Sequence, residues 1–297
     1  MIHEGVLRYR GARYLWAALL LVLGCAILYS TQRGLRPAGG GTWQGYVLGT
    51  IGALIIVWLS WLGIRKRSYA SAVGSVAGWT SAHVYLGLAL TAIATLHCAA
   101  KFGWNVHTLA YVLMCAVVLS GMFGVYAYMS FPQRLSENRT GGSRAKLFAE
   151  LYALDNEGRE VARHCSASIY TAVKSSIERT AIGGGVLNQL LGRDRSLFLL
   201  GDAAAASAHT GLTNNQDQQG VIAYVSHRIP RVEKGPESAK LQSLVLILCR
   251  RQAVLRRIHR DIQLNAWLKL WLYVHVPLTV ALLVALVIHI LTTFLYW

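Results

Sequence analysis

Two pairs of histidines recur at the same interval in uncharged stretches of the sequence. His83 and His97 lie fourteen residues apart, and His275 and His289 repeat this interval near the end of the chain. At about 1.5 Å and 100° per residue, fourteen helical residues span roughly 21 Å and end within about 40° of the starting direction. In a helix, both imidazoles of a pair therefore leave the same face, at two different heights.

Two helices with this interval can face each other, so that four imidazoles form two pairs. Two neutral imidazoles from facing helices are a natural axial ligand set for a b-type haem, which is held without a covalent bond. The pattern predicts two haem b groups, with His83 opposite His275 and His97 opposite His289.

The cysteines give no alternative redox motif. The chain has no CxxC, no CxxCH and no ferredoxin-like series, and its five cysteines are widely separated: Cys25, Cys98, Cys115, Cys165 and Cys249. This argues against a covalent c-type haem, an iron–sulfur cluster or a zinc knuckle within this chain.

Membrane spans are the elements that would position the histidines. Of the 297 residues, 54% are hydrophobic and only 14% are charged, with a mean hydropathy of +0.40. A soluble domain would carry about a quarter charged residues. Uncharged runs long enough to cross about 30 Å of hydrocarbon must be helical, because lipid offers the backbone no hydrogen bonds. They predict five spans: 14–31, 46–64, 81–100, 107–130 and 270–295.

The expected fold is an all-α membrane protein. Five transmembrane helices form a haem-binding bundle from residues 1–130 and 267–297, and residues 131–266 form a largely helical cytoplasmic insertion between spans four and five. Within the insertion, helices are expected near Ala145 to Ala167 and Ala239 to Ala266. The insertion has no GxGxxG and no Walker-type motif, so no nucleotide or flavin site is predicted there.

The distribution of basic residues predicts the topology. The net charge of +16 comes from residues that cluster between the apolar runs, which indicates a membrane surface and no nucleic-acid partner. Basic residues flank the N-terminus and the turn between spans two and three: Arg8, Arg10, Arg13, Arg65, Lys66 and Arg67. The N-terminus and residues 131–266 are therefore expected on the cytoplasmic side of a bacterial plasma membrane, with the C-terminus outside. Spans three and five then run in the same direction, which determines how the histidines pair.

Other residues near the histidines have predicted supporting roles. Gly87, Thr91 and Ala94 continue the side of the helix that carries His83, and such small residues suit a flat macrocycle or simply close helix packing. Carbonyls one turn earlier, or Thr80 and Ser81, are candidates to orient the imidazoles. Four residues are candidate partners of the haem propionates: Arg67 or Lys269 for the inner haem, and Lys101 or His107 for the outer one.

Three further features of the sequence bear on the predicted site and its surroundings. His107, at the start of span four, is expected to be interfacial; as a ligand, it would displace one of the outer pair. Gly45 and Gly49 form a GxxxG motif that could let another helix approach closely. A run of basic residues has three possible roles: a solvated helix that favours anionic headgroups, a docking surface for an acidic electron-transfer partner, or counter-charge for the haem propionates. The run comprises Arg250, Arg251, Arg256, Arg257 and Arg260.

Other functions remain open at this point. Stacked histidines also suit a transition-metal or proton pathway in a haem-free transporter subunit. Against this, no acidic residue lies between Glu4 and Glu137 or after Asp261, and a cation translocator would be expected to carry one. The other alternative is a quinone-reactive membrane anchor of a respiratory oxidoreductase, with the quinol near His107, Tyr111 or Trp104.

The two histidine-bearing stretches, WTSAHVYLGLALTAIATLHC and WLYVHVPLTVALLVALVIHI, resemble the membrane di-haem cytochromes b. The chain looks most like ferric-reductase-like transmembrane domains and the cytochrome b subunits of bacterial respiratory oxidoreductases. The resemblance implies that His83, His97, His275 and His289 are axial ligands and that electrons cross the membrane. It also implies partners such as other redox subunits or soluble iron–sulfur, flavin or cytochrome c proteins. This chain lacks the flavin and nicotinamide domain of self-contained ferric reductases, so substrate chemistry would belong to another subunit or to a quinone.

Overall fold

The computed structural model describes residues 5–32, 39–67, 75–200, 211–231 and 235–295, without the side chains of Ile64, Lys66, Arg67 and Arg231. Within these residues, five helices are long and apolar enough to cross a membrane: Val6–Ser30, Trp43–Gly63, Val76–Cys98, Val106–Asn138 and Pro236–Leu295. The five predicted spans and the helical insertion between spans four and five are confirmed. The chain is an all-α, multi-pass membrane protein.

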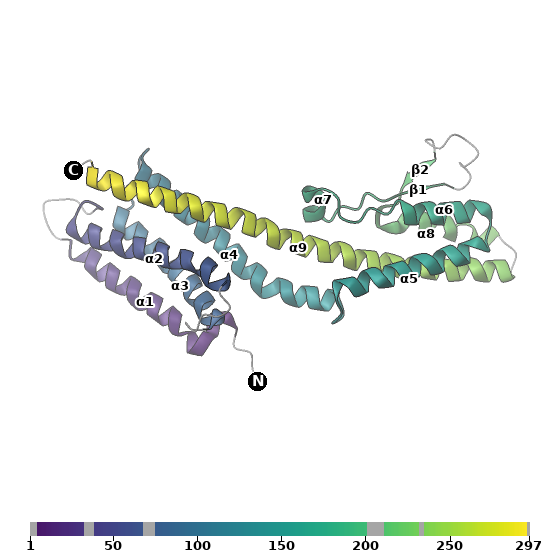
Figure 1. Cartoon of the computed structure of the whole chain (residues 1–297), viewed down its shortest axis with the longest axis horizontal. Helices are drawn as coiled ribbons and strands as arrows, with labels where there is room; N and C mark the ends of the chain where they lie inside the picture. Colours follow the sequence, from purple (N-terminus) through teal and green to yellow (C-terminus); the bar gives the residue numbers. More distant parts are fainter. Residues whose placement is uncertain (1–4, 33–38, 68–74, 201–210, 232–234, 296–297) are drawn as a thin grey trace. The chain divides into compact units, whose positions relative to one another are not determined.

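The chain divides into two compact units. Unit 1 comprises Met1–Ala127 and Trp271–Trp297, and unit 2 comprises Tyr128–Leu270. The described elements of unit 1 are η1 (Val6–Arg8), α1 (Tyr9–Ser30), α2 (Trp43–Arg67), α3 (Val76–Cys98), the first part of α4 (Val106–Asn138) and the last part of α9 (Pro236–Leu295) (Figure 1).

Local polar contacts determine where the central helices begin and end. The Ser75 hydroxyl accepts a hydrogen bond from the Gly78 amide at 3.1 Å, which caps the start of α3. At the other end, Ala99 has a left-handed backbone conformation, and the chain turns into α4 within a few residues. The Asn105 side chain then accepts from the Thr108 amide at 2.9 Å and begins α4. The short turn makes α3 and α4 antiparallel neighbours.

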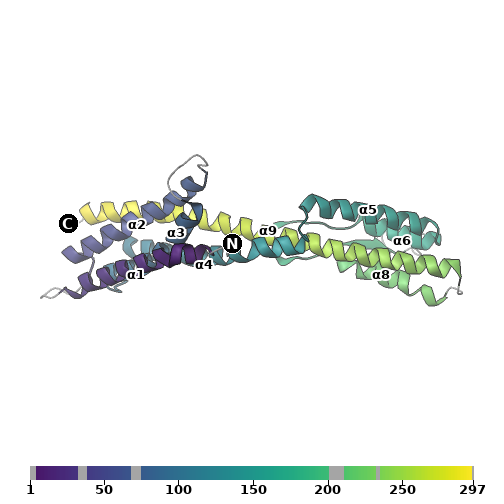
Figure 2. The same ribbon diagram turned by 90° about the horizontal axis from the view of Figure 1, so that it is seen from below.

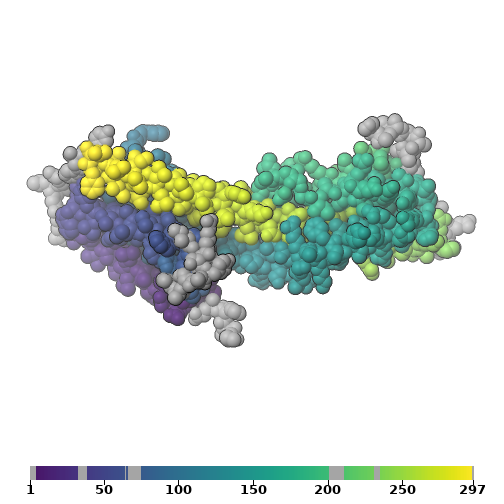
Figure 3. Space-filling view, in the orientation of Figure 1, coloured from purple at the N-terminus to yellow at the C-terminus, as the bar shows by residue number. Residues whose placement is uncertain are grey.

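The core of unit 1 draws side chains from all five spanning helices. Its buried residues include Cys25 of α1, Leu48 of α2, Ile93 of α3, Met114 of α4 and Leu282 of α9. Figure 2 shows α1, α2 and α3 running alongside one another within this unit. Large apolar side chains are also exposed on the outside of the bundle, as on the C-terminal part of α9, which forms part of the surface in Figure 3. A bundle that is apolar inside and outside suits a lipid environment.

Unit 2 packs two further cores against the N-terminal half of α9. Its described elements are the end of α4, α5 (Arg144–Arg163), α6 (Ala167–Glu178), α7 (Val186–Leu191), β1 (Leu197–Leu199), β2 (Leu212–Asn214), η3 (Gln216–Gln218), α8 (Gln219–Ser226), η4 (Ile229–Arg231) and the first part of α9. Helix α5 packs on the middle of α9, whereas α6, α8 and β1 pack on its N-terminal part (Figures 1 and 2). The two helices predicted in the insertion correspond to α5 and to α9, whereas the antiparallel pair β1–β2 was not predicted.

One expectation for the basic run is wrong. Arg251 is only 1% exposed, so it belongs neither to a solvated face nor to a docking surface. Its guanidinium donates to Asp155 of α5 at 2.5 Å, to Gln218 at 2.5 Å and to Thr180 at 2.7 Å. The sequence shows five arginines on one helix, but it does not show that an aspartate from another helix lies against one of them.

Candidate functional site

The four histidines and two leucines form a regular series on α3 and α9. Leu90 lies midway between His83 and His97, seven residues from each, and Leu282 lies in the same way between His275 and His289. Seven residues are close to two helical turns, so each leucine shares a face with its two histidines. Both leucines are buried in the core of unit 1, at 2% and 3% exposure. The histidine-bearing faces therefore point into the bundle.

The contacts between helices establish the direction of α9. His107 of α4 contacts His289, and Ser120 of α4 contacts His275, so α4 and α9 run in opposite directions. Since α3 is also antiparallel to α4, α3 and α9 run in the same direction. Two levels result, called here the His97 level (His97 and His289) and the His83 level (His83 and His275).

At the His97 level, two imidazoles from different helices come together. The ring centroids of His97 and His289 are 6.0 Å apart, and the ring planes are inclined by 76°. Nδ1 of His97 lies 2.8 Å from the carbonyl oxygen of Gly45 in α2. A carbonyl can only accept, so Nδ1 carries the proton and Nε2 is the nitrogen with a lone pair for a metal.

Glycines of α2 and of the turn before it accommodate the His97 ring. A Cβ atom placed on Gly49 would lie 2.8 Å from Cε1 of His97, and one on Gly40 would lie 3.2 Å from the same atom. A Cβ atom on Gly45 would collide with the backbone of Gly39 and Gly40. The motif at Gly45 and Gly49 is predicted to allow close approach of another helix; Gly49 lies against the His97 ring of α3, whereas Gly45 lies against the turn at Gly39 and Gly40.

His107 lies closer to the histidine pair than expected. It is exposed at the start of α4, as an interfacial residue would be, yet its Nδ1 lies 2.5 Å from Nδ1 of His289. The two ring centroids are 4.5 Å apart and the planes are nearly perpendicular, at 88°. One nitrogen must donate and the other must accept, so the two tautomers are coupled.

At the His83 level, α4 positions His275. The Ser120 hydroxyl donates to the Val117 carbonyl at 2.8 Å, and its lone pair can accept from Nδ1 of His275 at 2.7 Å. In this arrangement, the proton of His275 is on Nδ1, and Nε2 is the nitrogen whose lone pair can bind a metal. One turn earlier on α9, the indole of Trp271 donates to the Ser120 carbonyl at 2.9 Å.

Two glycines of α4 make room for these rings. A Cβ atom on Gly124 would collide with the indole of Trp271, and one on Gly121 would lie 3.6 Å from Cε1 of His275. Sequence reasoning missed this arrangement, although the run Ser120-Gly121-x-x-Gly124 was a possible signal for it.

The remaining predicted residues on α3 differ in how well their environments fit their predicted roles. His83 is partly buried on the core face of α3, and the helix directions place it at the height of His275. A Cβ atom on Gly87, one turn later, would meet no atom within 4 Å, so the space beside this glycine is open. The Thr80 hydroxyl donates to Val76 of its own helix at 2.9 Å, which leaves no proton for His83. The Ser81 hydroxyl is fully buried and makes no hydrogen bond among the described residues.

The four candidate propionate partners differ in their exposure and in their contacts. Lys101 is exposed, and its Nζ lies 3.8 Å from a Cβ atom placed on Gly39, beside the turn that contacts His97. Nδ1 of His107 lies at hydrogen-bond distance from Nδ1 of His289. Lys269 is exposed, six residues before His275 on the same helix. The side chain of Arg67 lies outside the described residues.

Comparison of the chain with protein-family models, curated proteins and solved structures finds no match. The residues themselves must therefore indicate the chemistry. Within the described parts of the chain, no three histidine, cysteine or acidic side chains form a group that could hold a metal ion by themselves. The arrangement instead offers paired imidazoles, which suit a metal whose other ligands come from a macrocycle.

Proposed function

We propose that this protein binds two b-type haems between α3 and α9 and carries electrons across the membrane as the cytochrome b subunit of a redox complex. His83 and His275 would hold one haem, and His97 and His289 would hold the other. The observation that carries the proposal is the His97–His289 pair, with its centroid separation of 6.0 Å and the Nδ1 proton of His97 held by Gly45.

The separation of the rings suits a single metal between them. Metal–imidazole bonds are about 2 Å long, so two imidazoles on opposite sides of one ion have ring centres roughly 6 Å apart. The described interior around them is apolar, with Leu90, Ile93 and Leu282 in one buried cluster. Open space beside Gly87, on the side that carries His83, is also what a bulky planar group requires.

Three of the four proposed ligands have an acceptor for their second nitrogen. Gly45 O serves His97, Ser120 Oγ serves His275, and Nδ1 of His107 can serve His289. Such acceptors fix the tautomer, hold the plane of the ring and raise the basicity of the ligating nitrogen. In the pair of His107 and His289, Nδ1 of His289 then carries the proton and donates to Nδ1 of His107, whose own proton is on Nε2.

A haem bound in this way supplies reversible one-electron chemistry of its iron. The chain's own residues provide position and environment. Two protein imidazoles would hold each haem and would leave its iron no open position for water or oxygen. The Gly45 carbonyl and the Ser120 hydroxyl hold the imidazoles of His97 and His275 in one orientation. The roughly 21 Å between the two histidines of each helix supports one haem near each side of the bilayer.

We further propose that the N-terminus and unit 2 lie on the cytoplasmic side of a bacterial plasma membrane. The basic residues that flank the N-terminus and the turn after α2 support this orientation. Electrons would be exchanged with other redox subunits or soluble carriers, because no catalytic group beyond the histidine levels is evident in the described residues.

The direct test is a reduced-minus-oxidised spectrum with haem quantitation on the purified full chain. Two b haems per polypeptide are expected, and His97→Ala or His289→Ala should remove one and keep the other. His164→Ala, which changes an exposed histidine of unit 2, is the matched control and should keep both. A helical, correctly inserted protein that binds no haem would overturn the proposal.

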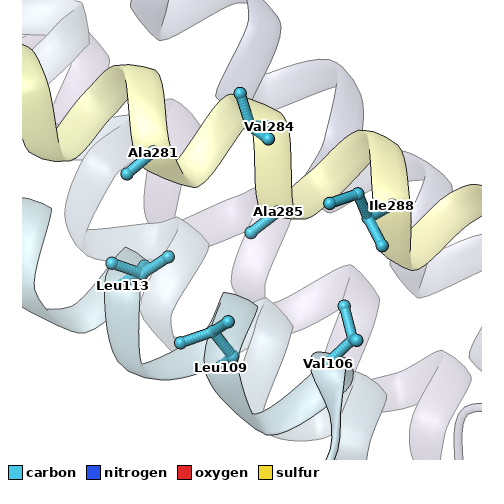
Figure 4. Close-up of a pocket in the computed structure, with 7 residues that line it drawn as sticks. All are labelled: Val106, Leu109, Leu113, Ala281, Val284, Ala285 and Ile288. Carbon is cyan, nitrogen blue, oxygen red and sulfur yellow. The ribbon is translucent and has the colours of Figure 1, made fainter.

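One observation favours a quinone as the exchange partner near the His97 level. An open groove of about 360 Å³ lies between α4 and α9 and is lined by apolar side chains of both helices, which Figure 4 labels: Val106, Leu109, Leu113, Ala281, Val284, Ala285 and Ile288. Two of these residues, Val106 and Ile288, are sequence neighbours of His107 and His289. An isoprenoid tail would fit the groove, with its head group near the exposed imidazole of His107.

A quinone analogue tests this second function. It should shift the spectrum of the His97-level haem and leave the other haem unchanged. Ala281→Phe and Ala285→Phe, which fill the groove, should abolish the shift without loss of haem. A spectrum that stays the same in the wild type at saturating analogue would exclude a quinone site here.

A further inference from the structure

Helix α7 of unit 2 presents apolar side chains outward. Val186, Leu187 and Leu191 are 67%, 72% and 54% exposed, whereas Leu190 faces inward and is buried. The six-residue helix lies between Gly185 and Gly192, in a segment for which the sequence suggested no function. Three large aliphatic side chains on one short helix form an apolar patch that a water-facing surface would not normally keep.

The patch is held in a fixed place on α9. The side-chain amide of Gln263 donates to the Leu190 carbonyl at 3.0 Å, and a Cβ atom on Gly192 would lie 3.2 Å from the same amide nitrogen. Gly192 has φ +63°, the left-handed conformation that ends α7 and turns the chain back. The apolar side chains therefore project from a helix that is anchored at its C-terminal end.

The anchoring point lies close to the membrane boundary. Gln263 is seven residues before Leu270, where the uncharged run of span five begins, which is about 10 Å along α9. The headgroup layer on each side of the hydrocarbon is roughly 5–8 Å thick. Trp267, an exposed indole between these two positions, is a typical interfacial side chain. Side chains that extend from α7 can therefore reach this layer.

The charge around the patch matches an anionic lipid surface. Arg193 and Arg195 directly follow α7 and are exposed, and Arg260 is exposed on α9, where it donates to Gln263 at 3.2 Å. The nearby acid, Asp194, is turned inward and accepts from Ser196 and from the amide of Asp217. Aliphatic side chains surrounded by arginines are the usual composition of an interfacial anchor.

We propose that α7 is a lipid anchor that inserts Val186, Leu187 and Leu191 into the headgroup layer of an anionic leaflet, with Arg193, Arg195 and Arg260 on lipid phosphates. The anchor holds unit 2 against the membrane from which α9 emerges. This inference depends on the membrane fold and is independent of haem binding.

The test uses the full chain in lipid nanodiscs with a polarity-sensitive fluorophore on Leu187→Cys. The background carries Cys249→Ser, because Cys249 is exposed and would also react. In discs that contain phosphatidylglycerol, the probe should show a blue-shifted emission and quenching by doxyl-labelled lipid. Both signals should be weaker in phosphatidylcholine discs, and Arg193→Gln, Arg195→Gln and Arg260→Gln together should remove the difference between the lipids.

The matched control is the same probe on Gln242→Cys. Gln242 is exposed on the same helix α9, about 30 Å before Gln263, and should show no quenching in either lipid. Equal quenching at both positions, or equal quenching at Leu187 in both lipids, would overturn the proposal. A blue shift without lipid quenching would also overturn it, because protein would then cover the patch.

Discussion

Two histidines of unit 1 and two buried ion pairs of unit 2 have different kinds of hydrogen-bond partners. In unit 1, the imidazoles of His97 and His275 contact neutral acceptors, the Gly45 carbonyl and the Ser120 hydroxyl. In unit 2, the fully buried Asp261 pairs with Arg139 at 2.5 Å, and the buried Arg251 pairs with Asp155. Lipid penalises every charge that lacks a partner, whereas a unit in contact with water can enclose ion pairs whose outer members reach solvent. The comparison predicts that the two units respond to different substitutions.

The largest effect is expected from breaking the Arg251 network. Arg251→Ala leaves Asp155, Gln218 and Thr180 without their shared donor, and such a loss costs about 3–5 kcal/mol. Hydrogen exchange of α5 and α6 should show unit 2 destabilised, while the haem spectrum of unit 1 stays unchanged. Arg250→Ala, the exposed neighbour, is the control. Unaltered exchange in Arg251→Ala would contradict the structural role given to this network.

The next effect concerns the glycine that contacts His97. Gly49→Val places side-chain atoms where Cε1 of His97 lies, since even a Cβ atom would be 2.8 Å away. The haem content should fall from two to one per chain, with unit 2 unaffected. Gly52→Ala on the same helix meets only Leu90 at an ordinary 3.7 Å and should keep both haems. Full haem content in Gly49→Val would mean that the His97 ring does not need the space beside Gly49.

A smaller effect is expected from the acceptor of His275. Ser120→Ala keeps the proposed ligand but removes the group that orients it, which typically lowers metal affinity 10–100-fold. Haem titration of the apoprotein should show one weakened site and one normal site. Ser60→Ala is the matched control, because Ser60 donates to Ile56 within α2 and contacts no histidine. Two unchanged affinities would show that Ser120 does not support the site.

The smallest expected effect is a difference between the maleimide reaction rates of two cysteines of unit 2. Burial, and then the nearby Glu237 carboxylate, raise the pKa of the Cys165 thiol, so less of it is thiolate at a given pH. Cys165 should therefore react with a maleimide more slowly than the exposed Cys249 at pH 8, and mass spectrometry of labelled peptides measures both. Faster labelling of Cys165 would indicate that the core around α6 opens readily.

The sequence predicted the parts of the fold that depend on local composition. Uncharged runs specify spans because the cost of a charge in lipid applies to each segment separately. The interval between His83 and His97 predicted a shared face because helix geometry alone determines it. The parallel arrangement of spans three and five followed because consecutive spans alternate in direction and these two differ by two in order, and the contacts of α4 with His289 and His275 agree with it.

The sequence did not show which groups lie opposite these faces. Ser120 and His275 are separated by 155 residues, and Asp155 and Arg251 by 96, so no local pattern joins them. The glycine pair at Gly45 and Gly49 predicts a close approach, but it gives no indication that an imidazole lies beside Gly49 and a turn beside Gly45. His107 was expected at the interface, and only the tertiary structure brings its Nδ1 to His289.

The leucine layer between the two histidine levels has a consequence for energy conservation. Leu90 and Leu282 pack with Ile93 and Met114 in one buried apolar cluster. In the proposed function, electrons would pass this apolar layer between the two haems, whereas the leucines themselves offer protons no polar group. The layer would then let electrons cross an energised membrane without itself adding a path for protons.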